Sequence, residues 1–266
     1  MSSAAQGIAA DQALIVEAAR EAGALAARYF RADNQVWHKN GNSPVSEADY
    51  AVDRFLSQTL RAARPDYGWL SEETEDSAER LETNRLFVVD PIDGTRGFLD
   101  GRREWCVSVA IVEAGRPVAG VLECPALGET YAALAGGGAT RNGAPIARIS
   151  GGAITSLTAS RKLNEAIRAV HGDGLAILPF VPSLAYRLAM VADSRVDGAF
   201  ARSGACDWDL AAADIILSES GGAMVDTGGE ALRYNRRSPK HGSLLAAGSN
   251  RIERLMALAK QGRFLH

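Results

Sequence analysis

The densest group of residues that could carry out chemistry is the motif Asp90-Pro91-Ile92-Asp93-Gly94-Thr95. It follows the apolar run Leu86-Phe87-Val88-Val89, which predicts a strand buried on both faces. The loops of α/β sheets usually place reactive groups at the carboxyl ends of such strands. The proline and the glycine of the motif predict a tight turn that brings its two carboxylates together. Two such charges repel each other unless a cation lies between them.

The chemistry of this motif indicates a metal ion and a phosphate group. Carboxylate ligands with no His or Cys nearby suit Mg²⁺ or Mn²⁺ better than zinc. The consecutive N–H groups of Gly94 and Thr95 would form a small nest for phosphate oxygens. The Asp-Pro-x-Asp-Gly pattern is also a favourable surface turn, so the motif alone leaves both interpretations open.

Three further acids could complete such a site. Glu72 lies in Ser71-Glu72-Glu73, before the predicted strand, whereas Asp49 and Asp209 lie near the starts of predicted helices. Taken singly, Glu72 could be a solvated acid and the two aspartates could be ordinary charges at helix N-termini. Together with the motif at 90–95, the three acids form a constellation that can hold divalent cations.

With these residues in view, the chain resembles the inositol monophosphatase family over almost its whole length. That family includes inositol monophosphatases, bisphosphate nucleotidases of the sulfate-assimilation type and one class of histidinol phosphatases. The resemblance rests on Pro44-Val45-Ser46-x-x-Asp49, Ser71-Glu72-Glu73, the motif at 90–95, Gly138-Ala139 through Asn142-Gly143, and Trp208-Asp209 through Gly221-Gly222. It implies a metal-dependent phosphomonoesterase with an α/β (α+β) fold, a layered αβαβα sandwich of the inositol monophosphatase and sugar phosphatase type. It also implies a homodimer.

The resemblance further implies a role for each acid. A first metal ion would be held by Glu72, Asp90 and the backbone carbonyl of Ile92. A second would be held by Asp90, Asp93 and Asp209. A weaker third site near Glu72 would fill when substrate binds, so two or three Mg²⁺ ions would serve each active site, with Mn²⁺ as a substitute. Sensitivity to lithium is also expected.

The attacking group implied by the resemblance is a water molecule, with no nucleophilic Ser or Cys. Thr95, oriented by Asp49, would position and deprotonate this water together with Glu72. Lys39 corresponds to a family lysine near the phosphate. The expected contacts of the substrate phosphate are therefore Lys39, Asp93, Gly94 and Thr95.

Three segments bear on which phosphate ester is the substrate. The motif continues as Thr95-Arg96-Gly97-Phe98, without the Asn that inositol monophosphatases commonly place two positions after the Thr. The segment Thr158-Ala159-Ser160-Arg161-Lys162 looks like one that lies near the nucleotide in bisphosphate nucleotidases, so Ser160 and Arg161 are expected substrate contacts. Arg202 stands where many inositol monophosphatases carry a Glu that contacts the polyol, and a cation there would suit a second phosphate. Both arginines could equally be ordinary surface cations.

The leading expectation is a 3'(2'),5'-bisphosphate nucleotidase, which converts adenosine 3',5'-bisphosphate to AMP and phosphate. An inositol-1-monophosphatase of broad specificity comes second. A histidinol-phosphatase comes third, because those enzymes share the Asp-Gly-Thr-Arg-x-Phe continuation but often lack the Trp that precedes Asp209 here. A sugar bisphosphatase is disfavoured by the compact length. A non-catalytic regulatory role through protein contacts is the alternative of another class, and the intact set of acids argues against it.

The elements expected around these residues are those of a mixed α/β protein. Helices are predicted from about Asp11 to Arg31 and Glu47 to Ala63, and over Lys162–Val170, Ser183–Asp193, Trp208–Ser220 and Arg251–Lys260. Further strands are predicted over Trp105–Val112, Pro117–Glu123 and Glu129–Leu134, in a mainly antiparallel meander with a hairpin turn at Asn142-Gly143. Residues 39–44 are predicted to form an exposed loop.

Gly151-Gly152 is the one plausible division of the chain. Residues 1–150 would form an N-terminal α+β half with most of the metal ligands, and residues 151–266 an α/β half that completes the site. No long flexible linker is evident, so we expect one compact unit.

Composition excludes several classes of protein. The chain has 266 residues, of which 47% are apolar and 23% charged, with a net charge of −3. That balance is average for a soluble domain and argues against a broad nucleic-acid-binding face. It is compatible with a small anionic partner, and the resemblance implies a small phosphorylated molecule. No signal peptide and no membrane span is predicted. The three cysteines are widely spaced and are expected to be buried free thiols, which makes the cytoplasm the default location.

Overall fold

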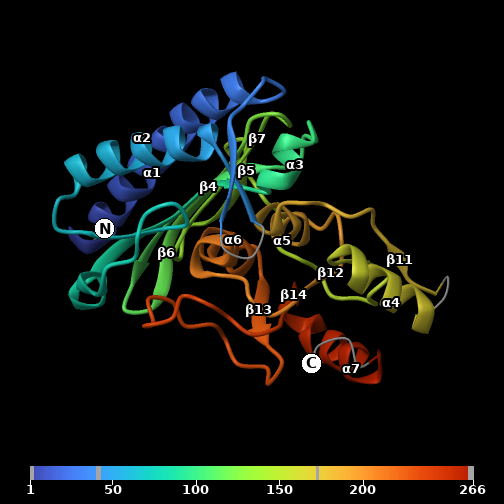
Figure 1. Cartoon of the computed structure of the whole chain (residues 1–266). Helices are drawn as coiled ribbons and strands as arrows, with labels where there is room; N and C mark the ends of the chain where they lie inside the picture. The colour runs from blue at the N-terminus through green and yellow to red at the C-terminus, as the bar shows by residue number, and fades with distance from the viewer. Residues whose placement is uncertain (1–2, 40–42, 172–173, 263–266) are drawn as a thin grey trace.

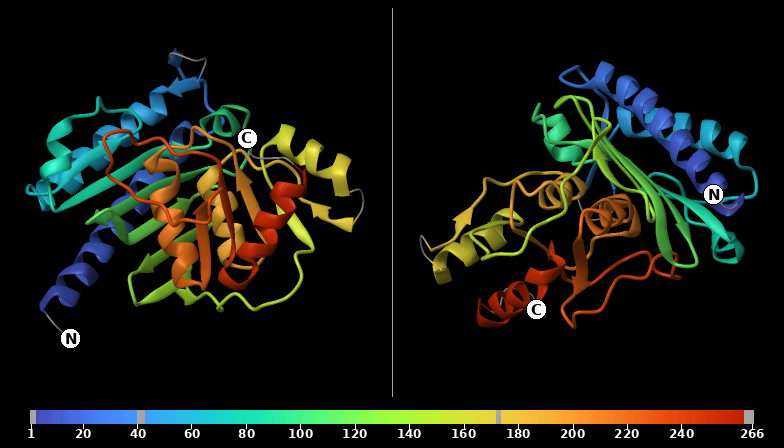
Figure 2. Two further views of the ribbon diagram at one scale, coloured as in Figure 1. Left: turned by 90° about the horizontal axis from the view of Figure 1, so that it is seen from below. Right: turned by 180° about the vertical axis from the view of Figure 1, so that it is seen from behind.

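The structure is a computed structural model that describes residues 3–39, 43–171 and 174–262. It has five layers, in which two helices, a seven-stranded sheet, two helices, a five-stranded sheet and two more helices follow one another (Figures 1 and 2). This confirms the predicted αβαβα sandwich. No described helix is long and apolar enough to cross a membrane.

The first two layers come from the N-terminal half of the chain. The outer helices are α1 (Ser3–Tyr29) and α2 (Glu47–Ala63). The seven-stranded sheet has the order β3-β4-β5-β6-β7-β8-β9, and only β3 and β4 are parallel. Its strands are β3 (Gly68–Ser71), β4 (Arg85–Asp93), β5 (Cys106–Glu113), β6 (Arg116–Cys124), β7 (Glu129–Leu134), β8 (Gly138–Arg141) and β9 (Ala144–Pro145).

The remaining layers come from the C-terminal half. Helices α5 (Leu184–Ala192) and α6 (Asp207–Glu219) lie between the sheets, and α4 (Arg161–His171) and α7 (Ile252–Gly262) cover the far side (Figure 1). The second sheet has the order β11-β10-β12-β14-β13. Its strands are β10 (Ser156–Thr158), β11 (Ala176–Ile177), β12 (Gly198–Ala201), β13 (Gly222–Asp226) and β14 (Leu244–Gly248). Short helices are α3 (Thr95–Leu99) and the 3₁₀ turns Ala78–Glu82 and Ser249–Arg251.

Strand β4 is buried on both faces, as predicted from its continuous apolar run. Phe87 and Val89 belong to the core under α1 and α2, whereas Leu86 and Val88 belong to the core shared with α5 and α6. This alternation follows from the two-residue period of a strand, which sends successive side chains to opposite faces. Because both faces are filled, the position of β4 is fixed from two sides.

The antiparallel meander and the hairpin turn are confirmed. Asn142 and Gly143 both have positive φ, 52° and 78°, and connect β8 to β9. All three cysteines are buried and free. The first sheet ends at Pro145 and the second begins at Ser156, while the core between them takes side chains from both parts of the chain. The division of the chain near Gly151-Gly152 into two halves of one compact unit stays a prediction.

Two local predictions are wrong. Ser43 and Pro44 are not in a loop, because β2 (Ser43–Ser46) pairs antiparallel with β1 (Val36–Lys39). Residues 40–42, which belong to the same prediction, lie outside the described part of the chain. The helix predicted from about Asp11 begins already at Ser3 in the structure. Its added turns are rich in Ala, which has the highest intrinsic helix propensity.

Candidate active site

The motif at 90–95 does not form a free turn, since β4 continues through Asp93. The pairing of β4 with β5 shifts between Asp90 and Asp93, where Asp90 lies opposite Ser108 and Asp93 opposite Cys106. In a regular strand, residues three apart point to opposite faces. The extra residue of the bulge lets both carboxylates reach the same place, which is a common use of bulges next to active sites.

Glu72 reaches this place because β3 and β4 are parallel neighbours. The Glu72 N–H donates to the Val89 carbonyl at 3.2 Å, so Glu72 follows β3 at the same edge where Asp90 lies in β4. Asp90 is buried, and its Oδ1 accepts from the Ile92 N–H at 3.0 Å. Two residues far apart in the sequence are thus brought together by strand pairing alone.

Asp93 is held by the first turn of α5. Its Oδ2 accepts from the Ala185 N–H at 2.7 Å and from the Ser183 hydroxyl. These donors favour the carboxylate, yet burial is the larger effect and raises the pKa of Asp93 to about 6. The positive end of the α5 dipole adds to the stabilisation of a charge at this position.

Asp209 comes from the first turn of α6. Its Oδ2 accepts from the Cys206 N–H at 2.6 Å, which satisfies one of the N–H groups at the start of that helix. Carboxylate oxygens of Asp90, Asp93 and Asp209 all lie within 4.8 Å of one another. The bulged end of β4 and the first turns of α5 and α6 therefore meet at one cluster of acids.

The electrostatics of the cluster indicate a site for cations. Removal from water raises the pKa of Asp90 and of Asp209 well above the ordinary value, and repulsion by the neighbouring carboxylates raises it further. Asp90 and Asp209 each keep one carboxylate oxygen without a hydrogen bond to the described part of the chain. A donor set made only of carboxylate and carbonyl oxygens fits a hard divalent cation such as Mg²⁺ or Mn²⁺.

Thr95 and Asp49 meet beside this cluster. Gly94 has a φ of 95° and starts the short helix α3, which begins with Thr95. The Thr95 hydroxyl lies 3.0 Å from the Ile92 carbonyl and 3.3 Å from Asp49 Oδ1. Asp49 is fixed in turn, because its Oδ2 accepts from the N–H of Ser46 at 2.7 Å and from its hydroxyl at 2.6 Å. Burial raises the pKa of Asp49 to about 6.

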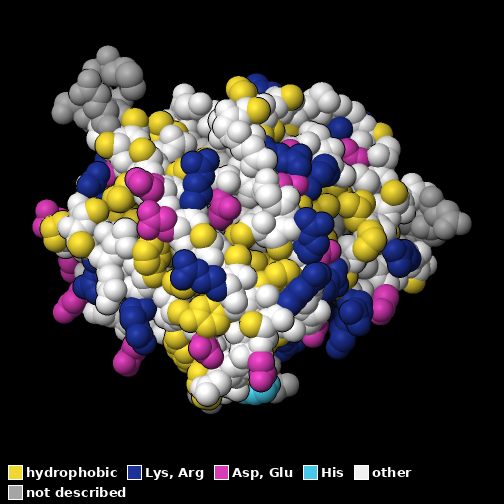
Figure 3. All heavy atoms as spheres, turned by 90° about the horizontal axis from the view of Figure 1, so that it is seen from above, with side chains coloured by type: hydrophobic (Ala, Val, Ile, Leu, Met, Phe, Trp, Pro, Cys, Tyr) yellow, Lys and Arg dark blue, Asp and Glu magenta, His cyan; other side chains and the backbone are white. Residues whose placement is uncertain are grey.

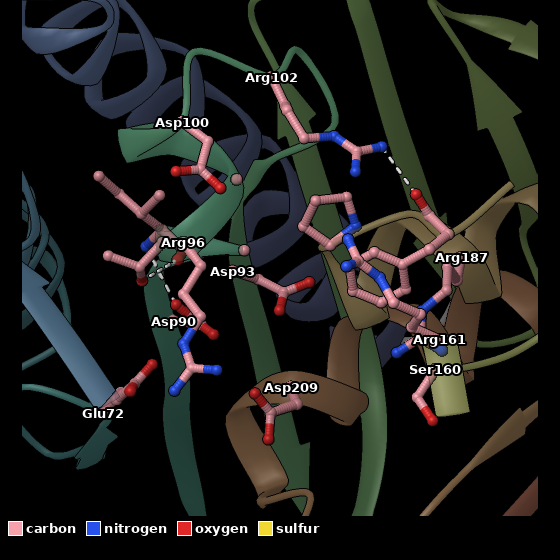
Figure 4. Close-up of a pocket in the computed structure, with 16 residues that line it drawn as sticks. Glu72, Asp90, Asp93, Arg96, Asp100, Arg102, Ser160, Arg161, Arg187 and Asp209 are labelled. Carbon is pink, nitrogen blue, oxygen red and sulfur yellow. Dashed lines mark hydrogen bonds between the residues drawn. The ribbon is translucent and has the colours of Figure 1, made fainter. Parts of the chain in front are cut away.

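The cluster opens into a cavity of about 630 Å³ with two sides of opposite charge. Figure 4 shows Glu72, Asp90, Asp93 and Asp209 toward one side, with the Arg96 side chain extending among them. On the other side lie Ser160 and three arginines, Arg102, Arg161 and Arg187 (Figure 4). The remaining lining residues are Ile92, Gly94, Thr95, Gly97, Asp100, Phe180 and Pro182.

Most residues predicted for the site are brought to this cavity. Glu72, Asp90, Ile92, Asp93, Gly94, Thr95, Ser160, Arg161 and Asp209 line it, and Asp49 contacts it through Thr95. Arg202 follows β12, is exposed and is not among the lining residues. Lys39 ends β1, but its side chain lies outside the described part of the chain. The roles assigned to these residues stay predictions.

Arg187 is a site residue that the sequence analysis missed. Only 6% of it is exposed, and its Nη1 has no hydrogen-bond partner among the described residues. Burial lowers its pKa to about 10, while Asp93 and Asp209 act in the opposite direction, so it stays charged at neutral pH. The signal in the sequence was a single cation within the apolar helix Leu184–Ala192. Buried arginines are rare unless they are paired or bind something.

Comparisons with known proteins agree with this geometry. The chain is 30% identical over 239 residues to the 3'(2'),5'-bisphosphate nucleotidase CysQ of Aggregatibacter actinomycetemcomitans, covering 84% of this chain and 87% of that protein. It is 34% identical over 229 residues to the inositol-1-monophosphatase of Mesorhizobium japonicum, with 81% and 85% covered. It is 30% identical over 259 residues to the histidinol-phosphatase of Chlorobaculum parvum, with 94% and 96% covered.

A solved structure shows the same fold. The extragenic suppressor protein suhB of Bartonella henselae superposes with a TM-score of 0.82 and 27% identity, over 95% of this chain and 99% of that one. The profile of the inositol monophosphatase family matches residues 10–263. Together with the named relatives, this match supports a phosphatase. The chain belongs to the inositol monophosphatase family.

Proposed function

We propose that the chain is a Mg²⁺-dependent 3'(2'),5'-bisphosphate nucleotidase that removes the 3'-phosphate of adenosine 3',5'-bisphosphate. The observation that carries this proposal is the division of the cavity into an acidic and a basic side. The acidic side suits cations and the phosphate that is cleaved. The basic side, with Arg161 and the buried Arg187, suits a second anionic group on the same molecule, because Arg binds phosphate with charge-assisted hydrogen bonds.

The acids would hold the metal ions in the arrangement expected from the family. Glu72, Asp90 and the Ile92 carbonyl would hold one Mg²⁺, and Asp90, Asp93 and Asp209 another, with a third near Glu72 when substrate is present. Bound there, Mg²⁺ would supply polarisation of the phosphoryl group, a lower pKa for a bound water and stabilisation of the leaving oxygen.

The chain's own groups would position the reacting atoms. Glu72 and the Thr95 hydroxyl, which lies 3.3 Å from Asp49, would orient the attacking water and take its proton. The N–H groups of Gly94 and Thr95 would hold the transferred phosphate. Arg187 would hold the second anionic group without needing to reorient, because burial restricts its side chain.

Turnover of three substrates tests this proposal. We expect a higher kcat/KM for adenosine 3',5'-bisphosphate than for inositol 1-phosphate or histidinol phosphate, all measured with saturating Mg²⁺. A lower kcat/KM for the bisphosphate than for inositol 1-phosphate would refute the proposed nucleotidase function and favour an inositol-1-monophosphatase of broad specificity. No activity on any of the three would favour the non-catalytic regulatory role.

Three properties of the whole protein accompany the proposal. We propose a homodimer, a cytoplasmic location and inhibition by lithium, as in the family the chain resembles. The three buried free cysteines agree with a reducing compartment. Light scattering of the purified protein measures the mass in solution, and a monomer would contradict the dimer.

A further inference from the structure

A second cavity adjoins the active site and has no role in the reaction as proposed. It measures about 300 Å³ and shares Arg102, Arg161 and Phe180 with the main cavity. Its other lining residues are Asn164, Glu165, Arg168, Leu178 and Pro179. Because three residues belong to both cavities, a substrate whose phosphate lies at the acids can extend into this side cavity.

The floor of the side cavity is apolar and carries an aromatic ring. Leu178, Pro179 and Phe180 follow one another in the segment after β11. Two guanidinium groups lie near the Phe180 ring, with 5.8 Å from its centroid to the Cζ of Arg102 and 5.8 Å to that of Arg161. Seen from above, one side of the molecule carries a group of Lys and Arg side chains interspersed with hydrophobic atoms (Figure 3).

The arginines differ in how firmly they are held. Arg102 donates to the Phe180 carbonyl at 2.7 Å and pairs with Glu104 at 3.0 Å, so it fixes the Phe180 backbone. Arg168 donates to the Ile177 carbonyl at 2.9 Å. Arg161 has no hydrogen bond or ion pair with the described residues beyond its contact with the Phe180 ring. Among the described residues it is therefore the least constrained of the three cations.

Asn164 adds an unused acceptor. Only 5% of this residue is exposed, and its Nδ2 donates to the Leu178 carbonyl at 3.2 Å. A carbonyl can only accept, so this bond assigns the amide orientation. Asn164 Oδ1 is then left without a partner among the described residues. A buried acceptor without a partner is destabilising, and a ligand with an N–H donor would supply the missing hydrogen bond.

We propose that the side cavity binds a planar nitrogen heterocycle with N–H donors, the base of the nucleotide substrate. The inference rests on the proposed function and deepens it. The base stacks against Phe180 and the Arg161 guanidinium plane, as bases do on aromatic and arginine side chains, and Asn164 accepts a hydrogen bond from it. A second phosphate fits this cavity less well, because Glu165 and Glu104 offset the arginines and the floor is apolar.

The first test replaces the ring. Phe180→Leu keeps an apolar side chain and removes the stacking surface. We expect it to raise KM for adenosine 3',5'-bisphosphate by about tenfold, the order expected for loss of one base–aromatic stack. KM for inositol 1-phosphate should rise much less, because this substrate has no base to stack on the ring, although Phe180 also borders the main cavity. Phe55→Leu is the matched control, since Phe55 is a half-buried phenylalanine of α2 that lines neither cavity. An equal change with both substrates, or none, overturns the proposal.

Binding of AMP separates this inference from the reaction. If Phe180→Leu weakens AMP binding about tenfold, the base site stands even where the nucleotide bisphosphate proves a poor substrate. If the wild type hydrolyses the bisphosphate efficiently and Phe180→Leu binds AMP as the wild type does, the base site is wrong and the nucleotidase proposal stands.

A second variant tests the acceptor. Wild-type protein should bind AMP more tightly than the analogue whose purine lacks the amino group. Asn164→Leu should remove this preference, because it removes the acceptor and keeps a side chain of similar size. A preference of unchanged size in that variant, with its fold verified by circular dichroism, would overturn the assigned role of Asn164.

Discussion

At the level of single residues, the candidate metal site depends on how each carboxylate is held. One carboxylate oxygen of each aspartate accepts a hydrogen bond from a backbone N–H. The distances are 3.0 Å for Asp90, 2.7 Å for Asp93 and 2.6 Å for Asp209. These bonds fix the direction of the carboxylates, which is what a preorganised metal site requires. Burial raises the pKa of all three groups, and repulsion by neighbouring carboxylates raises that of Asp90 and Asp209 further, so a cation would stabilise the ionised cluster.

Asp93→Asn tests the cluster directly. The variant keeps the shape of the side chain and removes one charge. We expect kcat to fall and the Mg²⁺ concentration that gives half-maximal activity to rise. Loss of a group that only hydrogen-bonds to a metal ligand typically costs about 10- to 100-fold in affinity or activity, and loss of a ligand charge should cost more. Titration of activity with Mg²⁺ measures both effects. Asp100→Asn is the control, because Asp100 lines the cavity but is exposed and outside the cluster. Equal behaviour of the two variants would contradict the placement of the metal.

Arg161→Ala tests the basic side of the cavity. Since Arg161 would contact the substrate in its ground and transition states alike, we expect KM for adenosine 3',5'-bisphosphate to rise about tenfold with kcat little changed. Initial-rate kinetics measure the two constants. Arg202→Ala is the informative comparison, because Arg202 was predicted to contact substrate but does not line the cavity. An equal rise in KM for Arg202→Ala would return that residue to the substrate contacts.

At the level of elements, the site forms where the end of one strand meets the first turns of two helices. The bulged end of β4, the first turn of α5 and the first turn of α6 each supply one acid or the donors that hold it. Gly94 lies between β4 and α3, and its backbone passes close to α5. A Cβ at this position would lie 3.1 Å from the Ser183 nitrogen, at a φ of 95°.

Gly94→Ala should therefore disturb both stability and activity. A side chain at positive φ costs about 1–3 kcal/mol, and the contact with Ser183 adds to it. For a chain of this size each kcal/mol lowers Tm by about 2–4 °C. Gly128→Ala is the matched control, because Gly128 has a φ of 68° and nothing within 4 Å of the added atom. Melting curves and kcat should both show a larger loss for Gly94→Ala, and equal losses would contradict the close packing.

How far the sequence predicts these elements depends on the range of the interaction. The helices over Glu47–Ala63 and Ser183–Asp193 and the strand into Asp90 follow from local periodicity, and the acids follow from a family motif. The pairing of β1 with β2 was missed because the sequence of residues 39–44 is typical of a loop. Arg187 and Phe180 were missed because long-range contacts set their place in the cavity. The start of α5 is bonded to Asp93 and the Phe180 carbonyl to Arg102, and no local pattern records such contacts.

At the scale of the whole molecule, the two sheets must be held together for the site to exist. Glu72, Asp90 and Asp93 come from the first sheet and its edge, whereas Arg161, Arg187 and Asp209 come from helices that follow it in the chain. A cation that binds both Asp93 and Asp209 links these parts. Binding to the folded chain alone raises the free energy of unfolding.

The stabilisation by Mg²⁺ should grow with pH. The pKa of Asp93 in the folded chain, about 6, lies above the ordinary value of 3.8, so below about pH 6 the folded site holds a proton that a cation must displace. As pH rises from 5 to 7.5, the site becomes ionised. We expect the Mg²⁺-induced rise in Tm to increase over this range, and without the metal the same ionisation lowers stability. A metal-induced shift that is constant or falls with pH would contradict this assignment.

The most direct test of the proposed nucleotidase function compares two nucleotides that differ only in the second phosphate. Adenosine 3',5'-bisphosphate and adenosine 3'-monophosphate carry the same base and the same scissile group, so their kcat/KM ratio with saturating Mg²⁺ reports the basic side of the cavity alone. We expect a preference for the bisphosphate of about 10- to 100-fold, the value of one or two charge-assisted hydrogen bonds. Equal efficiency for the two nucleotides would contradict it.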